Sequence, residues 1–349
     1  MSFQTVSWET YIAQSDIWPV IDVRSPNEYA HAHIPSAYSL PIFNNEERHE
    51  IGLTYKQKSS SKAIQVGLDY FGPKMKSFVL QAEELFPNNK ELLVHCWRGG
   101  MRSEAMCWLL ALYGWKVYQL EGGYKSFRNW VLQQFHRSYP IIVLGGYTGS
   151  SKTELLQQLA QAGEVIVDLE QIAGHKGSAF GNLGLPPQDS AEQFENKLAL
   201  ALHDAEKLRI IRNKKWIWVE GESQRIGQLN IPSAIYQQMK SAPNLFMHVS
   251  FEERLEKVVA EYGYYEKEAL VHAVLRIRKR LGGLYTKEVV NFLLENQVKS
   301  AFHILLSYYD RFYDRSSKDG VFSTYEIRVD EIPYSSRAAY LIDWVQKNI

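Results

Sequence analysis

The stretch 141-IIVLGGYTGSSKT-153 decides the fold class of this sequence. It opens with four apolar residues typical of a buried strand, continues through glycines and hydroxyl residues, and ends in Lys152 and Thr153. Residues 154–162 then have a helical pattern. A strand, a glycine-containing loop and a helix in this order are typical of a phosphate-binding loop, whose backbone N–H groups surround a phosphate. The pattern predicts an α/β domain with an anion site where the strand ends.

This loop offers specific groups to an anion. Lys152 supplies a positive charge, and the Thr153 hydroxyl could ligate magnesium if the metal takes part. Ser151 departs from the pattern, which has glycine there, so the spacing supports phosphate or polyphosphate binding more firmly than nucleotide binding. The predicted phosphate-binding and pyrophosphate-binding residues are Gly146, Thr148, Gly149, Ser150, Ser151, Lys152 and Thr153.

The rest of the chain extends the α/β pattern into two domains. Short apolar runs alternate with helical patterns on both sides of the loop, which favours parallel sheets with helical crossovers. We predict one domain over residues 1–135 and a phosphate-loop domain over 139–349, with a helical extension at about 251–315. The runs that read as strands are residues 18–21, 92–95, 117–120, 141–144, 165–167, 216–219 and 245–249.

Composition excludes several classes of protein. Hydrophobic residues make up 45% of the 349 residues and charged residues 22%, as in folded globular domains and unlike disordered chains. The 39 basic and 39 acidic residues cancel, which argues against a uniformly basic surface and leaves room for a local basic stripe. Only two cysteines and no long apolar run occur, so we expect a cytoplasmic protein without a membrane partner.

A second chemical site is predicted around Cys96, which follows the apolar run 92–95 directly and precedes a helical pattern. Backbone N–H groups at the start of that helix, with Arg98 and Arg102, would lower the pKa of the thiol and bind an anion. Gly99 and Gly100 free the backbone to do so. Cys107 lies within an apolar helical pattern, so we interpret it as a core residue.

The residues around Cys96 fit two kinds of enzyme. The His95-Cys96 pair with Arg102 matches the phosphate loop of cysteine phosphatases, and rhodanese-type sulfurtransferases use the same loop architecture. The upstream segments 22-DVRSPNEY-29 and 33-HIPSA-37 resemble the rhodanese domain. We therefore interpret residues 1–135 as rhodanese-like, and we expect Asp22 and Arg24 to form a structural ion pair.

Two further groups of residues are weaker candidates. Asp168 and Glu220 each follow a predicted strand, where a carboxylate could act as an acid or base, hold magnesium, or cap a helix. The stretch 272–287 contains basic residues and no acidic residue, and helical spacing would spread them around Ile277 and Leu281. It could contact an RNA backbone or form a solvated helix face. Its candidate tRNA-binding residues are Arg276, Arg278, Lys279 and Arg280.

The combination of these blocks resembles the tRNA 2-selenouridine synthase family from about residue 22 to residue 313. The most specific block is 96-CWRGGMRS-103 followed by 120-LEGGYK-125. Ala32, Ser36 and Ser151 depart from the family, which tends to have glycine at these positions. The other blocks are residues 47–48, 52–57, the phosphate loop, 175-HKGSAFG-181 and 220-EGESQRIG-227.

The resemblance implies a rhodanese-like domain joined to a P-loop NTPase-like α/β domain with a helical extension. It implies a transferase that geranylates the wobble 2-thiouridine of tRNAs such as those for Lys, Glu and Gln, then replaces the S-geranyl group with selenium. The implied substrates are geranyl diphosphate and selenophosphate, with no tightly bound cofactor, and a selenophosphate-supplying enzyme is the implied partner. Cys96 would act in selenium delivery, while Arg98, Gly99, Gly100 and Arg102 bind selenophosphate.

Two alternatives remain open. One is a tRNA sulfurtransferase in which Cys96 carries a persulfide and the phosphate loop binds ATP. The other is a rhodanese-like binding module joined to a phosphate-loop switch, without catalysis.

Overall fold

The computed structural model describes residues 3–14, 18–317 and 324–349, and it describes the side chains of these residues except 312–317. The chain divides into two compact units. The first comprises Met1–Gln134 with the short segment Glu195–Lys197, and the second comprises Phe135–Phe194 and Leu198–Ile349. Within the described residues, no helix combines the length and the apolar character needed to cross a membrane.

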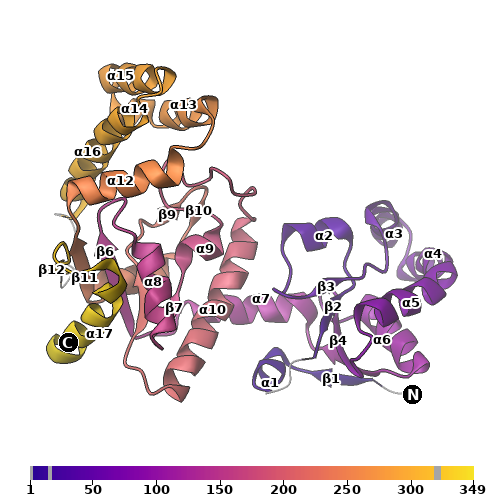
Figure 1. Cartoon of the computed structure of the whole chain (residues 1–349). Coiled ribbons are helices and arrows are strands. Elements are labelled where there is room, and N and C mark those ends of the chain that lie inside the picture. The colour runs from indigo at the N-terminus through magenta and orange to yellow at the C-terminus, as the bar shows by residue number, and fades with distance from the viewer. Residues whose placement is uncertain (1–2, 15–17, 318–323) are drawn as a thin grey trace. The chain divides into compact units, whose positions relative to one another are not determined.

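The N-terminal unit is built on a parallel sheet whose described strands have the order β1-β5-β4-β2-β3 (Figure 1). Asp22 pairs in register with His95, so the loops that follow β2 and β4 leave the same edge of the sheet. The strands are β1 Gln4–Val6, β2 Val20–Asp22, β3 Tyr38–Ser39, β4 Glu91–His95 and β5 Lys116–Leu120.

Helices cover this sheet and bury its apolar strands. Leu92 and Val94 on β4 are fully buried against Met106, Cys107 and Leu110 of α6, and burial of such side chains drives the packing. The helices are α1 Trp8–Ile12, α2 Pro26–His31, α3 Asn45–Gln57, α4 Ser60–Phe71, α5 Met75–Leu85, α6 Met101–Tyr113 and α7 Gly123–Gln134, with a 3₁₀ turn at Gly72–Lys74.

The second unit has a parallel sheet with the described strand order β12-β11-β6-β8-β7. Its central strand, β6, runs into the phosphate loop, and the pairing of Leu144 with Glu220 brings the carboxyl ends of β6 and β8 together. The strands are β6 Ile141–Gly146, β7 Val165–Val167, β8 Ile217–Glu220, β11 Asn244–His248 and β12 Thr324–Arg328, and a separate hairpin joins β9 Arg225–Ile226 to β10 Leu229–Asn230.

Two hydrophobic cores support this unit. One lies between the sheet and helices α8 and α17, and the other joins α12 to the helical extension α13–α16. The helices are α8 Lys152–Gln161, α9 Leu169–Ala173, α10 Ala191–Ile211, α11 Ser233–Ser241, α12 Phe251–Tyr262, α13 Lys267–Arg276, α14 Arg278–Leu281, α15 Gly283–Leu294, α16 Val298–Ser317 and α17 Arg337–Asn348, with a 3₁₀ turn at Tyr334–Ser336.

The predicted fold class is confirmed, and the predicted helical pattern around Ile277 and Leu281 is divided between two helices, α13 and α14. The helical path breaks at Ile277, whose φ and ψ are −97° and 4°, and again at Gly282, whose φ is +89°. A positive φ suits glycine and ends a helix. The basic residues therefore lie on short helices with different axes (Figure 1).

Candidate functional site

Cys96 lies where β4 ends, and residues 97–100 carry the chain into α6. The thiol is 4% exposed. Its sulfur accepts a hydrogen bond from the Gly100 amide at 3.4 Å and lies 3.2 Å from the Ser103 hydroxyl. The start of α6 thus brings a backbone N–H donor and a side-chain hydroxyl to one sulfur atom.

These contacts favour the thiolate. Burial raises the pKa of Cys96, but the Ser103 hydrogen bond, the positive charge of Arg102 and the Gly100 amide outweigh it, so the pKa lies below its ordinary value. The Ser103 hydroxyl also lies 2.9 Å from the Gly100 carbonyl, and Gln119 donates to its oxygen at 2.8 Å. Cys107 is fully buried, and burial raises its pKa, as expected of a core cysteine.

Two glycines let a later segment clamp the Cys96 turn. The amides of Tyr124 and Lys125 donate to the carbonyls of Cys96 and Trp97 at 2.8 and 3.0 Å. A Cβ on Gly123, whose φ is +59°, would lie 2.4 Å from the Cys96 carbonyl oxygen, and one on Gly99 would lie 2.8 Å from a backbone oxygen of β5. Only glycine fits such close backbone approaches. The 120–125 block is therefore part of the same site as the turn.

The two arginines of the turn are in different environments. The Arg102 guanidinium donates to the Glu28 carboxylate at 2.8 Å, and Arg48 also lies 3.7 Å from that carboxylate. Arg98 is exposed beside the turn. An anion arriving at the turn therefore meets Arg102 already paired with Glu28, a contact that the spacing of the sequence did not indicate.

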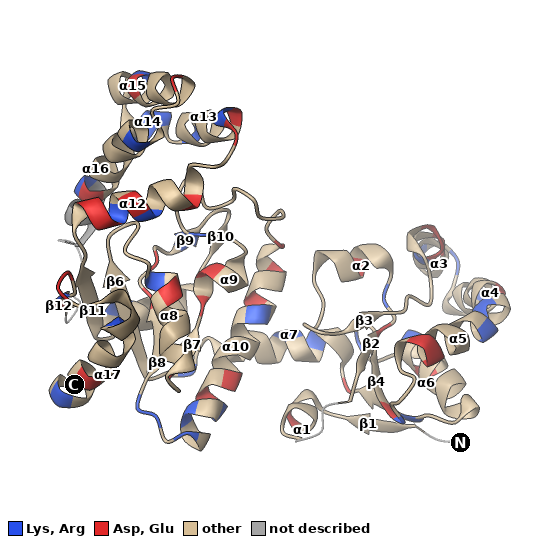
Figure 2. Cartoon of the chain, viewed as in Figure 1, with Lys and Arg blue, Asp and Glu red and all other residues tan. Residues whose placement is uncertain are grey.

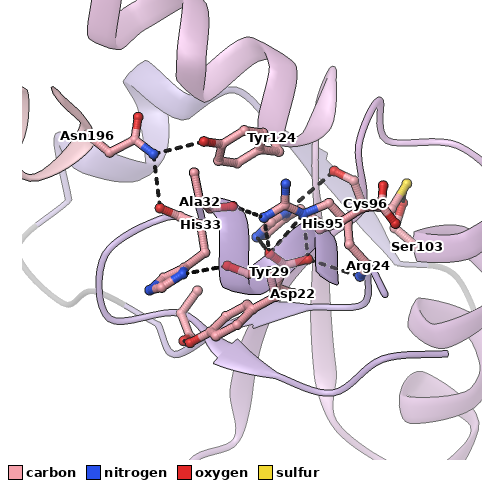
Figure 3. Close-up of polar contacts among 12 residues, drawn as sticks. Asp22, Arg24, Tyr29, Ala32, His33, His95, Cys96, Ser103, Tyr124 and Asn196 are labelled. Carbon is pink, nitrogen blue, oxygen red and sulfur yellow. Dashed lines mark hydrogen bonds and ion pairs between the residues drawn. The ribbon is translucent and has the colours of Figure 1, made fainter. Parts of the chain in front are cut away.

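A buried polar cluster holds the loops beside Cys96 (Figure 3). The Arg24 side chain donates to both Asp22 oxygens and to the Ala32 carbonyl at 2.6 to 3.0 Å, and its guanidinium lies 4.0 Å from the centre of the Tyr124 ring. Asp22 and Arg24 are at most 1% exposed. They form the structural ion pair that the sequence suggested, and they fix the positions of the loops after β2.

The phosphate loop connects β6 to α8 with unusual backbone angles. Ser151 has a φ of +57° and Gly149 a φ of +81°, both in the left-handed region. A side chain in this region costs roughly 1–2 kcal/mol, which explains why the pattern has glycine where this chain has Ser151. Ser36 is a second such position, with a φ of +69°. The loop thus accommodates Ser151 despite the cost of its positive φ.

Lys152 and Thr153 are held by the loop's own surroundings. The Lys152 ammonium donates to the Gly146 carbonyl at 2.9 Å, and the Thr153 hydroxyl donates to Glu170 at 2.9 Å. The Ser150 hydroxyl donates to the Tyr147 carbonyl at 2.7 Å. The Lys152 ammonium therefore bonds to a carbonyl of its own loop, and its positive charge lies where the loop would bind an anion.

Arg254 on α12 supports the phosphate loop and was not predicted. It is 3% exposed, donates to the Thr148 carbonyl at 3.1 Å, and forms a two-pronged pair with Asp310 at 2.9 and 2.7 Å. Its guanidinium also lies 5.0 Å from the Tyr147 ring centre. Its sequence context, one arginine in an amphipathic helix, gives no signal, because the contact joins residues more than 100 positions apart.

The carboxylates of Glu170 and Glu222 both lie within reach of the positive charge of Lys152, which acts to lower their pKa values. The carboxylates of both approach the same point, since a Cβ built on Gly177 would lie 2.6 Å from one and 2.7 Å from the other. Burial and the Glu222 charge raise the pKa of Glu170, against the opposing effect of Lys152. Burial also raises the pKa of Glu222. The pair therefore holds a proton near neutral pH.

Asp168 and Glu220, the two predicted candidates, lie elsewhere. Asp168 caps α9 by accepting from the Gln171 amide at 2.8 Å, and it also accepts from Gln157. Glu220 is fully buried and accepts from the Glu170 amide at 2.7 Å; burial, then the Asp168 charge, raises its pKa well above the ordinary value. Both positions therefore organise the backbone. Among the described residues, no group of three or more His, Cys, Asp and Glu side chains is arranged to hold a metal ion.

The segment 175–181 packs against α12 and α16. Lys176 pairs with Glu261 at 2.8 Å, and the Ala179 amide donates to the Tyr309 hydroxyl at 3.3 Å. Arg276, predicted as a tRNA contact, donates to the Ala179 carbonyl at 2.9 Å and to Asn182 at 2.7 Å. Arg276 therefore holds this loop.

The other basic candidates lie together on α14 (Figure 2). Arg278, Lys279 and Arg280 are exposed. Arg278 and Lys279 line one side of a groove of about 470 Å³, and Leu275 and Val290 form part of its apolar lining. The site residues thus fall into three places: the Cys96 turn, the phosphate loop and this basic helix.

Comparison with known proteins assigns both units to families. Residues 139–327 match the family model of the tRNA 2-selenouridine synthase AAA domain, and residues 9–129 match the rhodanese-like domain. The second match confirms the rhodanese-like interpretation of the N-terminal unit. The solved N-terminal domain of a protein from Clostridium difficile 630 is 43% identical, covers 37% of this chain and 99% of that chain, and has a TM-score of 0.35.

Relatives match along most of the sequence. The tRNA 2-selenouridine synthase of Sulfurovum sp. (strain NBC37-1) is 33% identical over 85% of this chain and 88% of its own length. The protein of the same name from Marinobacter nauticus is 32% identical over 85% of this chain and 87% of its own length. With its rhodanese-like unit, its phosphate-loop unit and these matches, the chain belongs to the tRNA 2-selenouridine synthase family.

Proposed function

We propose that this protein is a tRNA 2-selenouridine synthase that first geranylates and then selenates a wobble 2-thiouridine. The observation that carries the proposal is the presence, in one chain of this family, of a thiol whose surroundings favour the thiolate and a separate phosphate loop. Two different anion sites suit a reaction with two different phosphorus-containing substrates.

In the first step, the phosphate loop binds the diphosphate of geranyl diphosphate. The sulfur of 2-thiouridine forms a bond with C1 of the geranyl group, the C1–O bond breaks, and pyrophosphate leaves with the electron pair. The N3 proton of the base passes to solvent. Lys152 and the loop amides offset the negative charge that develops on the leaving group, which lowers the barrier because these donors are already oriented.

In the second step, selenium from selenophosphate replaces the S-geranyl group at the same carbon. Selenium forms the new bond to C2, geranylthiol leaves, and loss of the phosphoryl group to water completes the exchange. Cys96 acts in selenium delivery beside the bound anion, with Arg98, Arg102 and the amides of residues 99 and 100 as binding groups. Arg102 must then share its charge between Glu28 and the substrate.

The tRNA is the macromolecular substrate in this proposal, and an enzyme that makes selenophosphate is the supplier. Arg278, Lys279 and Arg280 are exposed cations on α14 and suit contacts with the phosphate backbone of the tRNA. Arg276, the fourth basic candidate, is also exposed and in addition bonds the loop at 175–181. The Thr153 hydroxyl and the Glu170–Glu222 pair are the groups that would accept magnesium if the reaction uses it.

The test is mass spectrometry of tRNA nucleosides after incubation with 2-thiouridine-containing tRNA, geranyl diphosphate and selenophosphate, with each small molecule omitted in turn. We expect S-geranyl-2-thiouridine with geranyl diphosphate alone, and 2-selenouridine after selenophosphate is added. Absence of both products from a folded, tRNA-binding protein would contradict the proposal. Consumption of ATP to adenylate the base would instead support the sulfurtransferase alternative.

Single substitutions separate the two steps. Lys152→Ala should abolish geranylation, whereas Lys257→Ala, which removes a partly exposed lysine of α12 that pairs with Glu154, should not. Cys96→Ala should leave geranylation intact and block selenation, with Cys107→Ala as the matched control. If Cys96→Ala still makes 2-selenouridine at the normal rate, the thiol has no part in the reaction.

A further inference from the structure

An apolar pocket adjoins the phosphate loop in the second unit. Thr148 of the loop forms one end of its lining, Val258 and Tyr262 of α12 and Leu305 of α16 form walls, and Phe180 reaches in from the 175–181 segment. The four residues beyond Thr148 are at most 5% exposed. Thr148 therefore belongs both to the predicted phosphate site and to the lining of this apolar pocket.

The lining suits a hydrocarbon better than a nucleoside. Two of its polar atoms are already engaged: the Ser178 hydroxyl accepts from the Phe180 amide at 3.1 Å, and the Tyr309 hydroxyl accepts from the Ala179 amide at 3.3 Å. A ribose or a base placed here would lose its hydrogen bonds to water without replacing them. An alkyl chain loses none and buries apolar surface.

Phe180 fills most of this compartment. Its ring lies 5.7 Å from the Tyr262 ring and 5.2 Å from the Phe302 ring, and the remaining space is about 10 Å³, close to what one water molecule needs. Phe180 belongs to a turn outside helices and strands, between Gly177 with a φ of +66° and Gly181. A chain of ten carbons fits only when the Phe180 ring leaves its place.

We propose that this pocket receives the hydrocarbon tail of an allylic diphosphate whose diphosphate lies on the phosphate loop, and that Phe180 occupies the pocket when no tail is bound. The inference rests on the proposed geranyl transfer. It adds the place where the hydrocarbon tail lies and the residues that limit the length of that tail. The tail runs from Thr148 past the residues of α12 and α16 that line the pocket, while C1, beside the loop, remains in position for sulfur attack.

The experiment is a chain-length switch. The full-length protein is given dimethylallyl, geranyl or farnesyl diphosphate with 2-thiouridine-containing tRNA, and kcat/KM is measured for each from the alkylated nucleoside. Leu305→Phe should lower geranyl transfer at least tenfold relative to dimethylallyl transfer. Phe180→Ala should raise farnesyl transfer at least tenfold relative to geranyl transfer.

A matched control lies in the same hydrophobic core. Leu293 on α15 is 1% exposed and does not line the pocket, so Leu293→Ala perturbs the core to a similar degree. It should leave the ratios among the three substrates unchanged. A change in preference among substrates is a readout that general loss of folding does not produce.

The outcomes separate this inference from the proposed function. Unchanged chain-length ratios in both pocket variants, with active wild-type protein, would overturn the pocket and leave geranyl transfer standing. If the wild-type protein transfers no prenyl group, the proposed function fails, and calorimetry then decides the pocket. The tail should make a non-hydrolysable geranyl diphosphate analogue bind at least tenfold more tightly than pyrophosphate, and Leu305→Phe, unlike Leu293→Ala, should remove that gain. An equal gain in all three proteins would overturn the inference.

Discussion

Replacing Ser103 with alanine should raise the pKa of Cys96. The Ser103 hydroxyl, 3.2 Å from the sulfur, is the largest of the contributions that lower this pKa. A hydrogen bond to a charged group contributes about 1.5–3 kcal/mol, so removing this bond should raise the pKa of Cys96. Where the pH lies below the pKa of both proteins, a loss of about 1.5–3 kcal/mol lowers the fraction of reactive thiolate roughly tenfold or more.

The assay is alkylation of Cys96 by iodoacetamide at a series of pH values, followed by mass spectrometry of the peptide that contains it. The midpoint of the rate against pH gives the pKa, because the thiolate is the reactive form. Glu28→Gln provides a comparison in the opposite direction, since it removes the carboxylate that pairs with Arg102 and leaves that positive charge uncompensated near the sulfur. The midpoint should move down in Glu28→Gln. A Ser103→Ala midpoint equal to that of the wild type would refute the reasoning.

Three other substitutions test the second unit. Ser151→Gly should raise the free energy of unfolding by up to about 1 kcal/mol in urea titrations, because glycine adopts a φ of +57° without strain; a loss of stability would contradict the strained loop. Arg254→Met should weaken pyrophosphate binding, measured by calorimetry, because it removes the hydrogen bond to the Thr148 carbonyl. It should also lower the free energy of unfolding by about 3 kcal/mol, because it leaves Asp310 unpaired. An unchanged affinity for pyrophosphate would show that Arg254 does not support the phosphate loop. Glu170→Gln should flatten the decline of stability with rising pH. Because the pKa of Glu170 is higher in the folded protein than in the unfolded chain, its contribution to stability is complete below about pH 4.5 and is lost as the pH rises through the pKa of the folded protein. An unchanged slope of stability against pH would show that Glu170 binds no extra proton on folding.

The sequence predicted the fold class and most of the sheet correctly, because buried parallel strands are continuous apolar runs. The run 141–144 became β6 and the run 92–95 became β4, with ends shifted by one or two residues. The two-residue β3 was missed because it is too short to show a pattern. The strand β12, Thr324–Arg328, was missed because its residues alternate with charged ones at the edge of the sheet.

The candidate site was predictable where neighbours in sequence make the contacts. The Gly100 amide and Arg102, both within six residues of Cys96, act on the thiol as the spacing suggested. Contacts between residues far apart in the sequence gave no such signal. The ion pair between Glu28 and Arg102 is an example. The sequence also offered no means of choosing among the carboxylates at the ends of β7 and β8, because a shift of two residues along the chain decides whether the charge of Lys152 acts on a side chain or the side chain is buried away from it. Glu222 and Glu220 differ in this way.

The clamp on the Cys96 turn has a consequence for how the protein is made. Gln119, which donates to Ser103, and Gly123, whose neighbour Tyr124 donates to the Cys96 carbonyl, both follow the cysteine by more than twenty residues. A nascent chain that has emerged only to residue 115 contains the cysteine without these partners. That chain already contains Ser103, Arg102 and Gly100, the groups that lower the pKa of Cys96, but it lacks the segment that holds their turn in place. The hydrogen bond from the Tyr124 amide that fixes the Cys96 turn can therefore form only after synthesis has passed residue 124.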